Sequence, residues 1–253
     1  MPILLLKLLL VPSLIGLVTL SGRRWGPSIA GWLSAFPIVS GPILFFIAME
    51  HGNHFAAVAA TATLSAVVAT IVFGLAYAWA ATRFYWPGSL VVGLLFYGLA
   101  VSVLNAIPLP LLATAIVTAT AIVVAPRFFP KVTARFVLPK ASTIDLPLRM
   151  VVGAVLVLSV TYFSSNLGPR LSGIFAMFPV MGTVLAVFSH RGAGREFTIN
   201  LLRGQLLGWY AFSTFCLSLA LMLENSTIAL AFSIATAAAL AVQIMSRRFV
   251  QSH

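Results

Sequence analysis

The chain has 253 residues, of which 61% are hydrophobic and only 8% are charged. A soluble core cannot bury so much apolar sequence, whereas a bilayer can, because each membrane-spanning helix needs roughly 20 apolar residues. This composition excludes a soluble enzyme or binding domain and predicts an integral membrane protein whose main partner is the lipid bilayer.

Apolar runs bounded by glycine, proline and charged residues predict an all-α bundle of nine transmembrane helices. In chain order the predicted helices cover about 3–20, 28–49, 55–82, 89–106, 109–126, 147–165, 170–189, 197–223 and 227–246. The first run lacks the basic start and the small-residue cleavage site of a signal peptide, so we interpret it as a true span.

The lysines and arginines predict how these helices are oriented. Of the 15 basic residues, twelve fall in gaps on one side of the membrane, Lys7 and Arg170 fall on the other, and Arg203 lies within a predicted helix. Short cytoplasmic loops carry the excess of basic residues, so we expect the N-terminus outside and the C-terminus inside. The charges lie in short gaps and not on one polar face, which favours contact with an anionic membrane surface over a nucleic-acid partner.

A twelve-residue stretch occurs twice, 142 positions apart. Residues 26–37 read GPSIAGWLSAFP and residues 168–179 read GPRLSGIFAMFP, so both begin with Gly-Pro, contain a central glycine and end with Phe-Pro. The same offset pairs Gly52 with Gly194. Self-similarity that keeps its register over so long a stretch indicates an internal duplication.

The duplication predicts a 4+1+4 organisation of the nine helices. Repeat one covers 1–106, a connecting helix and a basic cytoplasmic linker cover 107–146, and repeat two covers 147–253. We expect the basic stretch from Arg127 to Arg149 to lie as a connector against lipid headgroups. Because an odd number of spans separates equivalent points, the repeats should cross the membrane in opposite directions. Such inverted repeats are a recurrent architecture of secondary transporters.

Each Phe-Pro dipeptide is expected to break a helix near the middle of the membrane. Ten residues of helix cover about 15 Å, half of the roughly 30 Å hydrocarbon core. A proline removes an N–H donor, and inside a membrane such a break survives only against protein or a water-filled cavity. Two breaks at one depth therefore predict a shared site, with helix N-termini directed at an anionic or polar ligand. The alternative is that each proline only kinks a helix and the nearby small residues serve close packing.

The candidate substrate-binding residues lie at these breaks and on the helix that follows the second one. They are Phe36, Pro37, Ser40, Phe178, Pro179, Thr183, Arg203 and Gln205. An arginine within an apolar helix indicates a functional site by default, although Arg203 is close enough to the helix end for its side chain to reach the membrane surface instead. The substrate would be a small molecule or a lipid.

Residues for catalysis or metal binding are scarce. The chain has four acidic residues, none expected near the middle of the membrane, and a single cysteine, Cys216, expected to serve packing. His51 and His54 beside Glu50 have a spacing that metal sites use, but the absence of a fourth ligand favours a solvated loop. There is also no phosphate-binding loop. We therefore expect no enzymatic activity, no cofactor and no metal site.

The second Phe-Pro stretch, together with His190-Arg191 and the segment NLLRG at 200–204, resembles small four-helix bacterial inner-membrane proteins of the GlpM type. The resemblance covers most of 147–250 clearly and 1–106 faintly, and the chain departs from the family by having two units and an extra helix. It implies a helical bundle in a bacterial inner membrane.

Two functions remain open from the sequence. The leading hypothesis is a secondary transporter or permease with its site at the two breaks. The GlpM-type family has a loose link to exopolysaccharide (alginate) production, which implies the alternative, a non-transporting scaffold for envelope polysaccharide or lipid machinery. The sequence also leaves a homodimer open.

Overall fold

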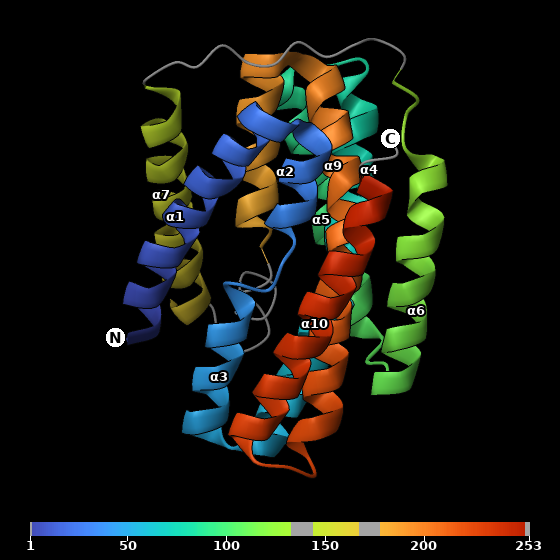
Figure 1. Cartoon of the computed structure of the whole chain (residues 1–253). Helices are drawn as coiled ribbons and strands as arrows, with labels where there is room; N and C mark the ends of the chain where they lie inside the picture. The colour runs from blue at the N-terminus through green and yellow to red at the C-terminus, as the bar shows by residue number, and fades with distance from the viewer. Residues whose placement is uncertain (1, 133–143, 167–177, 251–253) are drawn as a thin grey trace.

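The computed structural model describes residues 2–132, 144–166 and 178–250, and over these residues the chain is helical with no β-strand. The first elements are α1 (Pro2–Trp25), α2 (Pro27–Ser34), α3 (Ser40–His51), α4 (Asn53–Ala81) and α5 (Trp86–Ala106). They are followed by α6 (Leu111–Val124), the 3-10 helix η1 (Ala125–Phe128), α7 (Asp145–Asn166), α9 (Val180–Leu223) and α10 (Ile228–Val250). Figure 1 shows these helices packed side by side as a bundle.

Within the described ranges, five helical segments are long and apolar enough to cross a membrane: α4, α5, α6 with η1, α9 and α10. The predicted all-α class is therefore confirmed, and these helices fit a multi-pass membrane protein. The helix predicted over 28–49 is divided into α2, with 8 residues, and α3, with 12 residues. Neither alone could cross a hydrocarbon core of roughly 30 Å. The division lies at Pro37, where the sequence predicts a break.

The two helices predicted over 170–189 and 197–223 meet at a bend inside α9, and the part over 170–177 lies outside the described residues. The bend occurs at Gly194, whose φ of 85° and ψ of 176° interrupt the helix. Gly52 separates α3 from α4 in the same manner. In Figure 1 the junction of α3 and α4 lies at the lower end of the molecule, whereas the bend of α9 lies at the upper end.

Helix α9 is the centre of the bundle and packs against α2, α4 and α10. It approaches α2 closely because two glycines one turn apart face that helix. A Cβ atom at Gly204 would collide with the carbonyl of Ser28, and one at Gly208 would collide with the carbonyl of Trp32. This is the close backbone approach that a Gly-xxx-Gly pattern permits between membrane helices.

Helices α1 and α7 pack against each other along one side of the bundle. A small apolar core that includes Ile15 of α1 and Val157 of α7 joins them to the start of α9. The sequence places Arg149 in a surface connector, and this expectation is wrong, since Arg149 is buried within α7. Its burial is possible because Asp145, one turn earlier, supplies an opposite charge.

Candidate functional site

The two Phe-Pro dipeptides form the same tight turn. The Ile38 N–H donates to the Phe36 carbonyl across Pro37, with an N···O distance of 2.8 Å. The Val180 N–H donates to the Phe178 carbonyl across Pro179, also at 2.8 Å. A hydrogen bond between residues two apart defines a γ-turn, and the φ of −79° and ψ of 66° at Pro179 are those of its common inverse form.

A helix begins directly after each turn. The first hydrogen bond of α3 runs from the Gly41 N–H to the Pro37 carbonyl, at 2.9 Å, and the matching bond of α9 runs from the Thr183 N–H to the Pro179 carbonyl, at 2.8 Å. Each hydrogen bond of the first turn and of the first helix start is therefore repeated 142 residues later in the chain. The first N–H groups of the helix that starts after each proline have no hydrogen-bond partner within that helix. Such N–H groups lie at the break and attract negative charge.

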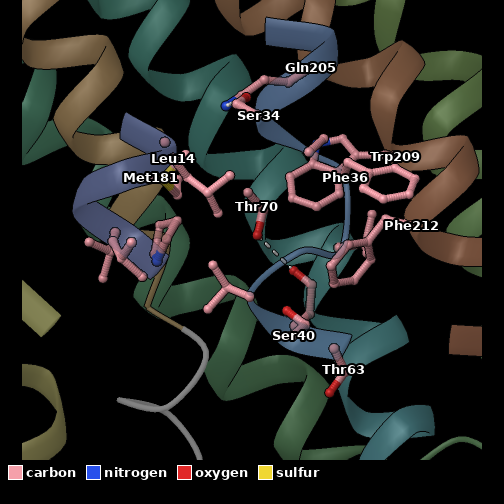
Figure 2. Close-up of a pocket in the computed structure, with 18 of the residues that line it drawn as sticks. Leu14, Ser34, Phe36, Ser40, Thr63, Thr70, Met181, Gln205, Trp209 and Phe212 are labelled. Carbon is pink, nitrogen blue, oxygen red and sulfur yellow. Dashed lines mark hydrogen bonds between the residues drawn. The ribbon is translucent and has the colours of Figure 1, made fainter. Parts of the chain in front are cut away.

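A cavity of about 260 Å³ lies where the two breaks meet. Both breaks line it, and so do parts of α1, α4, α7 and the second half of α9. Figure 2 shows the rings of Phe36, Trp209 and Phe212 on one side of the cavity and Leu14 with Met181 on the other. None of the described residues that line the cavity has a charged side chain. Its walls are therefore apolar and aromatic, with a few neutral polar groups.

The polar groups lie toward the two ends of the cavity, with the Thr70 hydroxyl between them (Figure 2). At one end the Gln205 Nε2 donates to the Ser34 Oγ at 2.9 Å, and the Ser34 hydroxyl donates to the Gly31 carbonyl at 2.7 Å. Toward the other end lie Ser40 and Thr63. Hydroxyl and amide groups of this kind can bind a neutral or anionic ligand through hydrogen bonds.

Five of the eight residues predicted from the sequence line this cavity: Phe36, Ser40, Phe178, Pro179 and Gln205. Pro37 forms the first break but is not part of the lining. Thr183 lies in the first turn of α9 and is buried, and its hydroxyl has no hydrogen-bond partner within the described part of the chain. A buried hydroxyl without a partner costs free energy, which a bound polar ligand could recover. Thr183 directly follows the lining residue Gly182 and is therefore a further candidate polar group beside the cavity.

Arg203 does not join the others. Its side chain is exposed and lies outside the cavity. The reason is helical geometry, because Gln205 faces the cavity and a residue two positions away points about 200° around the helix. A negatively charged ligand in this cavity would therefore interact with helix N-termini and hydroxyl groups, and not with Arg203.

Several lining residues were missed by the sequence analysis although helical spacing could have indicated them. On α4 the missed residues are Thr63, Ala66, Val67 and Thr70, and on the second half of α9 they are Trp209 and Phe212, which lie on the same face as the predicted Gln205. Spacings of three, four and seven residues place side chains on one face of a helix. Ser34 lies one turn before Pro37 and could have been included for its position alone.

The histidines near the end of α3 are solvent-exposed. The Nδ1 of His54 lies 3.8 Å from an oxygen of Glu224, with both side chains largely exposed. Within the described ranges no group of three or more histidine, cysteine, aspartate or glutamate side chains gathers in a way that could hold a metal ion. Cys216 is fully buried in the core and touches no other cysteine, being the only one.

Comparisons of the chain with known protein families, with curated protein sequences and with solved structures find no match.

Proposed function

We propose that the chain is a secondary transporter or permease of the bacterial inner membrane, and that its substrate occupies the cavity between the two Phe-Pro breaks. The observation that carries this proposal is the convergence of both breaks, 142 residues apart in the chain, on one cavity. Irregular backbone at membrane depth is tolerated where it is buried in protein or lines a cavity, and discontinuous helices of this kind bind substrates in transporters.

The directions in which equivalent segments run support the same function. In Figure 1 the chain runs downward from α2 through α3, whereas it runs upward from the start of α9 to the bend. The equivalent segments thus run in opposite directions, as they would if nine spans crossed the membrane in a 4+1+4 order. A substrate site between inverted repeats can be reached from either side when one repeat rocks against the other.

The walls of the cavity suggest the chemical class of the substrate. Aromatic and aliphatic side chains favour a ligand with an apolar body, and the Ser34–Gln205 pair, with Ser40 and Thr63, offers hydrogen bonds to a polar part. The starts of α3 and α9 would stabilise an anionic group. We therefore propose a small amphipathic molecule, neutral or with a single negative group.

Cysteine accessibility tests whether the cavity is open to water. In a Cys216→Ala chain, single cysteines replace Thr63, which lines the cavity, or Thr61, which does not and is equally half-buried. A charged, water-soluble thiol reagent applied to membrane vesicles should modify Thr63→Cys and leave Thr61→Cys unmodified. If neither cysteine reacts, the cavity is dry, and a non-transporting scaffold becomes the better explanation.

Transport itself is tested with proteoliposomes incubated in a bacterial metabolite extract, with and without an ion gradient. Compounds retained by the vesicles are identified by mass spectrometry. A compound that accumulates with the wild type should be lost with Ala66→Leu, which fills the cavity, and reduced with the double variant Pro37→Ala, Pro179→Ala, which restores a donor at each break. No protein-dependent accumulation of any compound would contradict the proposal.

A further inference from the structure

Two arginines and one aspartate form a partly buried cluster where α1 ends and α7 begins. The Arg23 Nη2 lies 2.8 Å from the Asp145 Oδ2, and the Arg149 Nε lies 2.9 Å from the same oxygen. The side chains are 17%, 5% and 24% exposed for Arg23, Arg149 and Asp145. The Arg149 guanidinium also lies over the ring of Phe188, 5.3 Å from its centroid. These contacts hold both arginines in place.

The cluster has one positive charge more than its carboxylate neutralises. The whole chain has only four acidic side chains. Glu196 pairs with Arg195, Glu224 lies near His54, and Glu50 is in the last turn of α3. The segments outside the described ranges contain no aspartate or glutamate. No acidic side chain of this chain is therefore available to pair with the second arginine, and an uncompensated charge is costly where it is partly buried.

Unused hydrogen-bond donors lie at the same place. The Nε of Arg23 and the Oγ1 of Thr19 are both buried, and neither has a hydrogen-bond partner among the residues that the structure describes. Thr19 is only 6% exposed. Arg23, Arg149 and Thr19 together line a small space of about 10 Å³ that is separate from the large cavity. That volume is the least that one water molecule needs, so a monatomic anion, which is larger, requires the partly exposed Arg23 side chain to shift slightly outward.

The polar groups around this space distinguish between occupants. A water molecule in a buried site normally makes two to four hydrogen bonds and acts both as donor and as acceptor. Here the unpaired Arg23 Nε can only donate, the hydroxyls of Thr19 and Ser189 can donate as well, and the surrounding charge is positive. An acceptor with a negative charge satisfies both unpaired donors and also neutralises the second arginine, whereas water does only the first.

We propose that a monovalent anion of about the size of chloride binds between Arg23, Arg149 and Thr19. The anion completes the charge balance that Asp145 begins and links the end of α1 to the start of α7. This inference does not depend on the transport proposal, because it concerns a different site and a structural ligand.

The test measures the melting temperature of the full purified chain in a neutral detergent. Sodium chloride is titrated against sodium gluconate at constant ionic strength, so that general screening stays the same. Chloride should raise the melting temperature by several degrees and reach a plateau, because a ligand that binds only the folded state stabilises it. Thr19→Val, which removes one donor, should shift the midpoint to about tenfold higher chloride, and Arg23→Gln should abolish the response.

Arg24→Gln is the matched control. Arg24 is adjacent, its side chain is exposed over the ring of Trp25, and its loss changes the net charge by the same amount. The control should keep the full chloride response. A melting temperature that does not depend on chloride would overturn the proposal, as would an equal response in wild type, Thr19→Val and Arg24→Gln. Stabilisation by inorganic phosphate or by anionic lipid alone, at constant chloride, would also overturn it, because the stabilising ligand would then be a phosphate group and not a monatomic anion.

Discussion

Gly52 and Gly194 have the same backbone conformation although 142 residues separate them. Their φ and ψ angles are 84° and 171° at Gly52 and 85° and 176° at Gly194. This region of φ and ψ is essentially restricted to glycine. Both glycines also redirect the chain between two helices, as an internal duplication predicts for equivalent positions. Four experiments follow from this and related features.

The first prediction concerns topology. In a Cys216→Ala chain, single cysteines replace Glu50 or Gly192, which are both exposed and are again 142 positions apart. These positions avoid the glycine-only conformations of their neighbours. If the repeats are inverted, an impermeant maleimide added to intact cells should label Glu50→Cys only, because the basic loops place Gly192 inside. Lysis of the cells should then expose Gly192→Cys. Equal labelling of both positions in intact cells would contradict the inverted arrangement.

The second prediction concerns backbone strain. Gly52→Ala and Gly194→Ala should each lower the free energy of unfolding by about 1–3 kcal/mol, since alanine rarely adopts a positive φ. The loss would be measured as a lower melting temperature in detergent. Gly192→Ala is the control for Gly194, because its added Cβ meets no atom within 4 Å and its φ is not positive. The control should be neutral or slightly stabilising. Equal melting temperatures for all three variants would argue against these glycine conformations.

The two breaks were predictable from the sequence because their signals are local. A proline after phenylalanine interrupts a helix wherever the chain places it, and a repeated motif reports a repeated structure. Phe36, Phe178 and Pro179, which lie at these breaks, line the cavity. Arg203 does not line the cavity, because the prediction used its depth along the helix and not the direction in which its side chain points around the helix axis. The angle between Arg203 and Gln205 decides which of the two side chains can enter the site.

The remaining contacts depend on which helices become neighbours, and sequence periodicity does not contain that information. The hydrogen bond from Gln205 to Ser34 joins residues 171 positions apart, and the ion pair of Arg23 with Asp145 joins residues 122 apart. Each needs a particular pairing of helices before it can exist. Only the bond of Asp145 with Arg149 could have been read from the sequence, because residues four apart meet on a helix surface.

The third prediction concerns the contact between α2 and α9. Gly204→Ala should destabilise the chain by about 1–3 kcal/mol, since its Cβ would collide with the backbone of Ser28 and the helices would have to separate. Gly98→Ala on α5 is the matched control, because its Cβ would meet no atom within 4 Å. Melting temperatures in the same detergent provide the comparison. Gly98→Ala should match or exceed the wild type, since alanine favours helix more than glycine. A smaller loss for Gly204→Ala than for Gly98→Ala would contradict the close contact.

The fourth prediction concerns the carboxylate shared by the two arginines. Asp145→Asn keeps the size of the side chain but removes the charge that both Arg23 and Arg149 contact. Breaking a buried ion pair by removing one partner typically costs about 3–5 kcal/mol, and partial exposure of Asp145 should reduce that to about 2–3 kcal/mol. The loss would be measured as a lower melting temperature in chloride-containing buffer.

Glu50→Gln is the control for Asp145→Asn because it makes the same change of charge at an exposed position of α3. Its melting temperature should stay close to that of the wild type. The double variant Asp145→Asn, Arg23→Gln should recover part of the lost stability, since it removes one of the two like charges that Asp145→Asn leaves facing each other. Recovery of this kind distinguishes a charge effect from a packing effect, because a second packing defect would only add to the first. If the double variant is less stable than Asp145→Asn, the two arginines do not repel each other strongly. The cluster then carries no destabilising excess of positive charge.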